Sequence, residues 1–337
     1  MSRDKEIEFS QSFEHQAAVN NLVAETFESA DASGGEQVFE SNGRLNTSVL
    51  VRNAKILLAA GDVILAKNIF RALVEAGESL GVAYSGLGSC YELENKPDLA
   101  IKAYREAIIF EPTYGCLYAL ADLYIKREEY QNAVGTLLRA QNLNRLSSTH
   151  LFEIHKSLGS CYMQLSQLNN AEAHYRRAYE INPGSDALHV NIGSLAMKKG
   201  DLSTALLHFK EATRINPLNG GAYTGLGLAH IGLGNREPAH EAFANSLRID
   251  IHDVTALYHL VKLAYELKQF ETVSELLNKY IQNNTVNSNI LYSYAGILYH
   301  RMLYREALEE CEKLSALKPD HEGAKKMKEL ILTKLSN

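Results

Sequence analysis

Small, apolar and aromatic residues recur in a fixed order along most of this 337-residue chain. The segments that begin at Gly81, Asp186 and Gly220 each contain an Ala that is followed four residues later by an aromatic residue. The pattern returns about every 34 residues, a period typical of helix-turn-helix repeats. Strand-like alternation of apolar and polar residues does not persist anywhere, so the pattern predicts helices throughout.

This period divides the chain into repeats. We place eight units at 47–80, 81–113, 114–147, 152–185, 186–219, 220–253, 254–287 and 288–321, between an N-terminal arm at 1–46 and a closing helix at 322–337. Small residues at the eighth and twentieth positions of a unit, such as Gly193 and Ala205, let its two helices cross closely. Large residues at the twenty-fourth position, such as Phe209, are predicted to fill the space between units.

Prolines and glycines agree with this register. Four prolines close repeats where a helix must stop, and two open second helices, where a missing N–H costs nothing. The closing prolines are Pro112, Pro183, Pro217 and Pro319, and the opening ones are Pro97 and Pro238. Gly61, Gly200 and Gly234 are predicted to form the turn between paired helices.

These residues resemble the tetratricopeptide repeat, and the resemblance covers nearly everything after residue 46. It implies an all-α fold, an α-solenoid in which the units wind into a right-handed superhelix, with residues 322–337 as a capping helix. It also implies a protein that holds a peptide or helix of a partner against the concave face lined by the first helices. The lysine and asparagine clamp that some such repeats use for C-terminal carboxylates is not present in this sequence.

Composition favours one long array over several domains, because 46% of the residues are hydrophobic and only six are proline. We expect a cytoplasmic protein, since the start lacks a secretory signal and no run is apolar enough to span a membrane. The four cysteines have no CxxC spacing, so neither zinc nor a disulfide framework is expected. We predict no cofactor.

The net charge of −6 is unevenly placed. Residues 1–46 contain three basic and nine acidic residues, which leaves 31 of each in the rest of the chain. A nucleic-acid-binding protein is expected to carry a basic excess on its folded part. The balanced repeats therefore disfavour nucleic acid as a partner.

Catalytic motifs are weak. Glycine pairs such as Gly86 with Gly88 follow no predicted strand, which argues against a phosphate-binding loop. His150 and His155 are the closest pair of histidines at near-helical spacing, but no acid or cysteine completes a metal site. No nucleophile has a recognisable base partner. We therefore predict a protein that is not an enzyme.

The partner is predicted to lie on outward positions of the first helices in the C-terminal half, an apolar and aromatic floor with basic edges. Such side chains suit the binding of a helix in a groove, although several could equally pack against neighbouring helices. The predicted groove residues are Val190, Met197, Lys198, Leu228, Ile231, Tyr258, Lys262, Tyr265, Tyr292 and Tyr299. The predicted function is a protein-interaction scaffold or adaptor, with a chaperone for secreted or assembling proteins and an enzyme accessory domain as alternatives.

The arm has an apolar stripe at helical spacing, followed by flexible linker sequence. The stripe contains Phe9, Phe13, Ala17, Leu22, Val23 and Phe27. We hypothesise that the arm occupies the groove of its own chain, or that of a neighbour in a homodimer, and competes with the partner. The alternative is a disordered or partner-binding tail.

Overall fold

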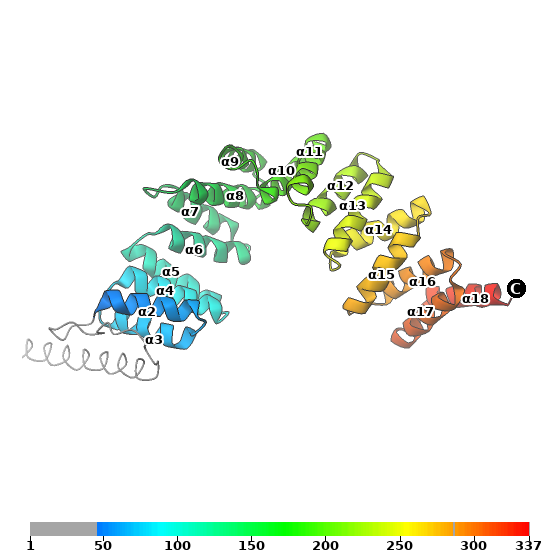
Figure 1. The fold of residues 1–337 in the computed structure, drawn as a ribbon, viewed down its shortest axis with the longest axis horizontal. Helices are drawn as coiled ribbons and strands as arrows, with labels where there is room; N and C mark the ends of the chain where they lie inside the picture. The colour runs from blue at the N-terminus through cyan, green and yellow to red at the C-terminus, as the bar shows by residue number, and fades with distance from the viewer. Residues whose placement is uncertain (1–45, 286, 337) are drawn as a thin grey trace, which may run out of the picture. The chain divides into compact units, whose positions relative to one another are not determined.

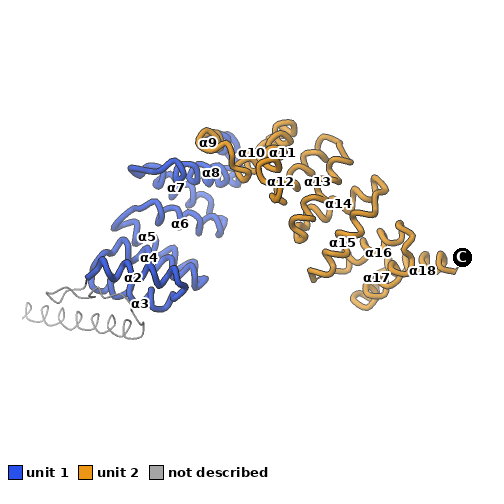
Figure 2. Tube along the Cα trace, viewed as in Figure 1, with its two compact units in different colours: residues 1–174 blue, residues 175–337 orange. Residues whose placement is uncertain are grey.

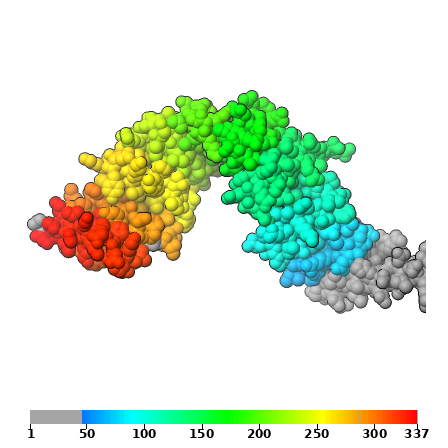
Figure 3. Space-filling view, turned by 180° about the vertical axis from the view of Figure 1, so that it is seen from behind, coloured from blue at the N-terminus to red at the C-terminus, as the bar shows by residue number. Residues whose placement is uncertain are grey.

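The computed structural model describes residues 46–285 and 287–336, and these residues fold into helices α2 to α18 with no strand among them. The predicted all-α solenoid is confirmed. The chain divides into an N-terminal unit, residues 1–174, and a C-terminal unit, residues 175–337 (Figure 2). Within each unit the helices follow one another in chain order (Figures 1 and 3). None of the described helices is both long and apolar enough to cross a membrane.

The helices of the N-terminal unit are α2 (Thr47–Ala59), α3 (Val63–Glu75), α4 (Leu80–Leu93), α5 (Pro97–Phe110), α6 (Tyr114–Lys126), α7 (Tyr130–Gln141) and α8 (Ser148–Gln164). Helix α9 (Leu168–Ile181) contains the boundary between the units. The C-terminal unit continues with α10 (Asp186–Lys199), α11 (Leu202–Ile215), α12 (Gly220–Gly232), α13 (Arg236–Ile249), α14 (Val254–Leu267), α15 (Glu271–Asn283), α16 (Ser288–His300), α17 (Tyr304–Leu317) and α18 (Glu322–Leu335).

Second helices such as α3, α5 and α11 pack on their own first helix and on the first helix of the next repeat, as α3 does with α2 and α4. Turn chemistry sets the helix ends. Gly61, Gly200 and Gly234 have φ of 87°, 82° and 79°, as the predicted turns require. Asp62 and Asp201 then cap α3 and α11, because their carboxylates accept hydrogen bonds from backbone N–H groups of the first turn.

Large rings fill the space between repeats. Phe209 on α11 is 1% exposed, and its ring lies against Gly193 on α10 and Gly225 on α12. The other residues at the predicted twenty-fourth position are also buried: Phe70, Tyr104, Leu137, Tyr175, Phe243 and Leu277. At the C-terminal end α18 contacts α16 and α17 and buries Ala324 and Ile331.

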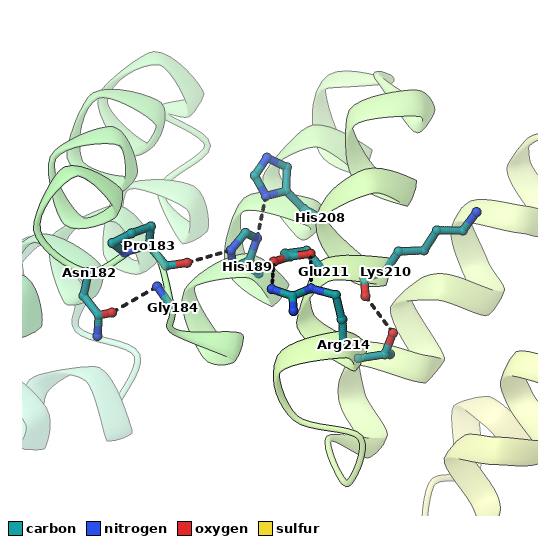
Figure 4. A network of polar contacts seen from close by, with 9 residues as sticks. Asn182, Pro183, Gly184, His189, His208, Lys210, Glu211 and Arg214 are labelled. Carbon is teal, nitrogen blue, oxygen red and sulfur yellow. Dashed lines mark hydrogen bonds and ion pairs between the residues drawn. The ribbon is translucent and has the colours of Figure 1, made fainter.

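A pair of histidines joins α10 to α11 inside one repeat (Figure 4). The Nε2 of His189 lies 3.0 Å from the carbonyl oxygen of Pro183, so this nitrogen carries the proton and donates. In the neutral pair, the Nδ1 of His189 then accepts from the Nδ1–H of His208, 2.9 Å away. The preceding repeat contains the same pair, with His155 Nδ1 and His174 Nδ1 2.9 Å apart. Burial and the neighbouring His189 lower the pKa of His208.

We predict that Gly227→Ala destabilises the C-terminal unit by about 1 to 3 kcal/mol, because the new Cβ would lie 2.7 Å from the buried ring of Phe243. Gly221→Ala is the matched control on the same helix, where the nearest atom is 3.5 Å away. Urea unfolding followed by circular dichroism measures both. Equal stability of Gly227→Ala and the parent chain would show that the ring has room to move.

The histidines also predict a loss of stability in acid. His208 is held neutral in the folded chain, whereas an unfolded histidine takes up a proton near pH 6.5. The free energy of unfolding should therefore fall as the pH drops below about 6.5. His208→Gln keeps a donor for His189 but removes one titrating group, so it should flatten this slope by at most about 1.4 kcal/mol per pH unit.

The matched control is His252→Gln, at an exposed histidine. Urea unfolding between pH 5 and pH 8 compares the three chains. A slope that is the same in His208→Gln and in the parent chain contradicts the prediction.

Candidate functional site

The predicted groove residues lie on the first helices of the C-terminal unit, α10, α12, α14 and α16. The structure exposes some of them and uses others for packing. Tyr258 on α14 is 65% exposed, and Tyr265 and Ile231 are also exposed. The apolar part of the surface that is open to a partner is therefore centred on α12 and α14.

The remaining apolar residues of the predicted groove are half-buried. Val190 and Met197 pack around Phe209, and Leu228 packs against the large C-terminal cluster of buried side chains. The ring of Tyr292 lies 5.0 Å from that of His321, at the start of α18. The ring of Tyr299 lies 5.5 Å from that of Tyr304 on α17. These side chains contribute to the floor of the surface more than to its open face.

A pocket of about 170 Å³ opens between α12 and α14. Ile231 and Leu263 form its apolar part, and Lys262, Arg236 and Glu266 form its polar part. The Nε of Arg236 lies 2.9 Å from a carboxylate oxygen of Glu266, so this pair is neutral overall. Lys262 is exposed and pairs with no acid among the described residues. The pocket therefore offers apolar surface beside one uncompensated positive charge.

His259 forms one wall of this pocket. Its ring stacks on buried Phe243 at 5.2 Å and meets Tyr258 edge-on at 5.1 Å. Burial, and then the charge of Lys262, lower the pKa of His259. The imidazole is therefore neutral at physiological pH and adds a flat, weakly polar surface next to the exposed tyrosine. The sequence analysis had not singled out His259 or Arg236.

The N-terminal unit contains a pocket that the sequence analysis also missed. It measures about 220 Å³. Its lining includes Ser85 and Ser89 of α4 and Phe70 of α3. The helix α4 has Ser85 at the fifth position of its repeat, where α6 and α14 carry Tyr118 and Tyr258. The fifth position is also small at Thr224 and Val190, so Ser85 alone was no signal for a pocket in the sequence.

The metal hypothesis is not supported by the placement of its histidines. The ring of His150 stacks on that of Tyr114 at 3.8 Å, while His155 bonds to His174. Across residues 46–285 and 287–336, no three His, Cys, Asp or Glu side chains gather closely enough to hold a metal ion. The arm residues Phe9, Phe13, Leu22, Val23 and Phe27 lie outside the described residues.

Comparison with known proteins gives the same fold. Family models described as tetratricopeptide repeat match residues 51–114, 116–147, 154–185 and 187–217. A solved structure of a tetratricopeptide repeat protein from Parabacteroides merdae has a TM-score of 0.50 and 15% identity, over 75% of this chain and 99% of that one. At this identity the likeness shows the fold alone.

Two curated relatives are similar over shorter stretches. The BBSome complex member BBS4 homolog of Drosophila melanogaster is 28% identical over 130 residues, which is 38% of this chain and 26% of that protein. Anaphase-promoting complex subunit 3 of Schizosaccharomyces pombe is 27% identical over 103 residues, 30% of this chain and 15% of that protein. The matched stretch thus spans about a quarter or less of each relative. The matched family models show that residues 51–217 of this chain contain tetratricopeptide repeats.

Proposed function

We propose that this chain is a non-catalytic protein-interaction scaffold or adaptor, and that it holds a peptide or helix of a partner on the exposed face of α12 and α14. The observation that carries the proposal is Tyr258, an aromatic side chain that is 65% exposed beside a pocket with an apolar wall. Aromatic residues bury much area with few rotatable bonds to freeze, so they often anchor interfaces. The presence of tetratricopeptide repeats agrees with such a role.

The charge of this face indicates the chemistry of the partner. Arg236 and Glu266 neutralise each other, which leaves Lys262 as the charge that a ligand would meet. A partner helix with an aliphatic or aromatic residue for the pocket and a carboxylate one turn away fits both features. Two of the curated relatives are named as members of protein complexes, which is consistent with a scaffold but does not identify a partner.

We expect Tyr258→Ala to weaken partner binding by about 2 kcal/mol, roughly 30-fold, while the fold is retained. Peptides selected against the full chain from a displayed library of helical 15-residue sequences provide the ligands, and fluorescence anisotropy measures their affinity. The selected peptides should be rich in apolar residues with neighbouring acids.

Leu207→Ala is the matched control, because Leu207 is 66% exposed but lies on the second helix α11. Lys262→Ala should reduce affinity for acidic peptides more than for neutral ones. The proposal fails if Tyr258→Ala and Leu207→Ala bind the selected peptides as tightly as the parent chain does.

Autoinhibition by the arm stays a prediction, because residues 1–45 lie outside the described part of the chain. An arm that occupies the groove competes with every ligand, so deleting residues 1–40 must then tighten binding of the same peptides. Equal or weaker binding by the shortened chain discards autoinhibition. Light scattering of the full chain at several concentrations detects the homodimer that exchange of arms between two copies would require.

A further inference from the structure

The first repeat exposes a residue that every other repeat buries. Ile56 occupies the tenth position of its repeat and is 59% exposed. The residues at the same position in the other seven repeats are at most 5% exposed: Cys90, Leu123, Cys161, Leu195, Ala229, Leu263 and Ile297. Cys90 is buried in a cluster with Ile69 and Phe70 of α3, the helix that precedes its own. The face that contains Ile56 is thus the one on which a preceding element packs.

A second isoleucine of the first repeat is equally unusual. Ile64, at the eighteenth position, is 69% exposed and follows the turn that joins α2 to α3. The other seven repeats all carry a polar and exposed residue there: Asp98, Gln131, Asn169, Ser203, Glu237, Glu271 and Arg305. An apolar residue at this position in the first repeat alone indicates a contact that the other repeats do not make.

The face of α2 that contains Ile56 lacks the apolar residue on which another repeat of this kind would pack. Asn53 stands at the seventh position of the first repeat. Every other repeat has a large apolar residue there: Leu87, Leu120, Leu158, Ile192, Leu226, Leu260 and Tyr294. The first repeat, residues 47–80, carries four basic and three acidic residues, and one of the bases, Lys67, pairs with Glu94 at the C-terminal end of α4. An amphipathic occupant with an apolar stripe fits a surface on which isoleucines are set among polar residues.

The segment directly before α2 has this chemistry. Residues 1–45 carry a net charge of −6 and contain the apolar stripe of Phe9, Phe13 and Phe27. We propose that this stripe packs, within the same chain, over Ile56 of α2 and reaches Ile64 at the start of α3, and so closes the N-terminal end of the array. A repeat array exposes apolar surface at its ends unless a capping element covers it.

The length of the connection allows this contact within one chain. Eighteen residues separate Phe27 from Asn46, the N-cap of α2. A flexible segment of that length has an average end-to-end distance of about 23 Å. Ile56 lies about 15 Å along α2 from Asn46, since a helix rises about 1.5 Å per residue. Tethering at this distance gives an effective concentration on the order of millimolar, which favours the chain's own arm over that of a second copy.

Amide hydrogen exchange of the full chain and of the chain without residues 1–40 tests the proposal. With a millimolar effective concentration and an intrinsic affinity on the order of 100 µM, deletion should speed exchange of the protected amides in α2 and α3 about tenfold. Exchange in α4–α18 should be unchanged. The double variant Phe9→Ser, Phe13→Ser should reproduce the effect, and it leaves every repeat intact.

Substitutions in the first repeat provide a second test, in which the sequence of the arm is left unchanged. Ile56→Arg with Ile64→Arg should speed proteolytic cleavage within residues 1–30, whereas Ile109→Arg, at a residue 72% exposed on α5, should not. Unchanged exchange in α2 and α3 after the deletion overturns the proposal. So does a change confined to α12–α16, which would place the arm in the groove, or protection that disappears on dilution of a dimer.

Discussion

Close approach of neighbouring helices is the constraint on which the rest of the fold depends. Phe209 lies between Gly193 of its own repeat and Gly225 of the next, and a Cβ on either glycine would stand too close to its ring. Phe70 and Gly86 repeat the arrangement in the N-terminal unit. Because the rings of Phe70 and Phe209 fit against glycines of the next repeat, these repeats prepare the packing surface of the one that follows. The array then needs only nearest-neighbour contacts to extend.

The packing of these rings against glycines leaves the first helices with one face that does not pack against a neighbouring helix. On α14 the buried positions include Leu257, Leu260 and Ala264, while Tyr258 and Lys262 are exposed. The rigid helix fixes where these two side chains stand, so a partner meets them with little further ordering. Binding of this kind needs neither a cavity deep enough for a small molecule nor a movable loop.

The paired helices and their turns could be predicted because packing repeats the same residues at the same positions. Gly61, Gly200 and Gly234 were predictable for this reason, whereas Asn95, Glu128 and Ser166 adopt the same positive φ without a glycine. The site was less predictable. Tyr258 and Tyr292 both stand at the fifth position of a first helix, so the sequence does not distinguish them. Tyr258 stays exposed, whereas Tyr292 packs on the start of α18. Only contacts between distant residues decide between the two.

Departures from the repeat pattern therefore carry more information about function than the pattern itself. Where packing dictates the side chain, as at Phe209, the residue reports only that a neighbour is present. Ser85 is smaller than Tyr118 and Tyr258 at the same position, and it lines a pocket. Ile64 departs by being apolar where seven other repeats are polar, and it remains exposed. Each departure costs the array little, because it lies outside the contacts between rings and glycines, so such positions are free to be shaped by what the protein binds.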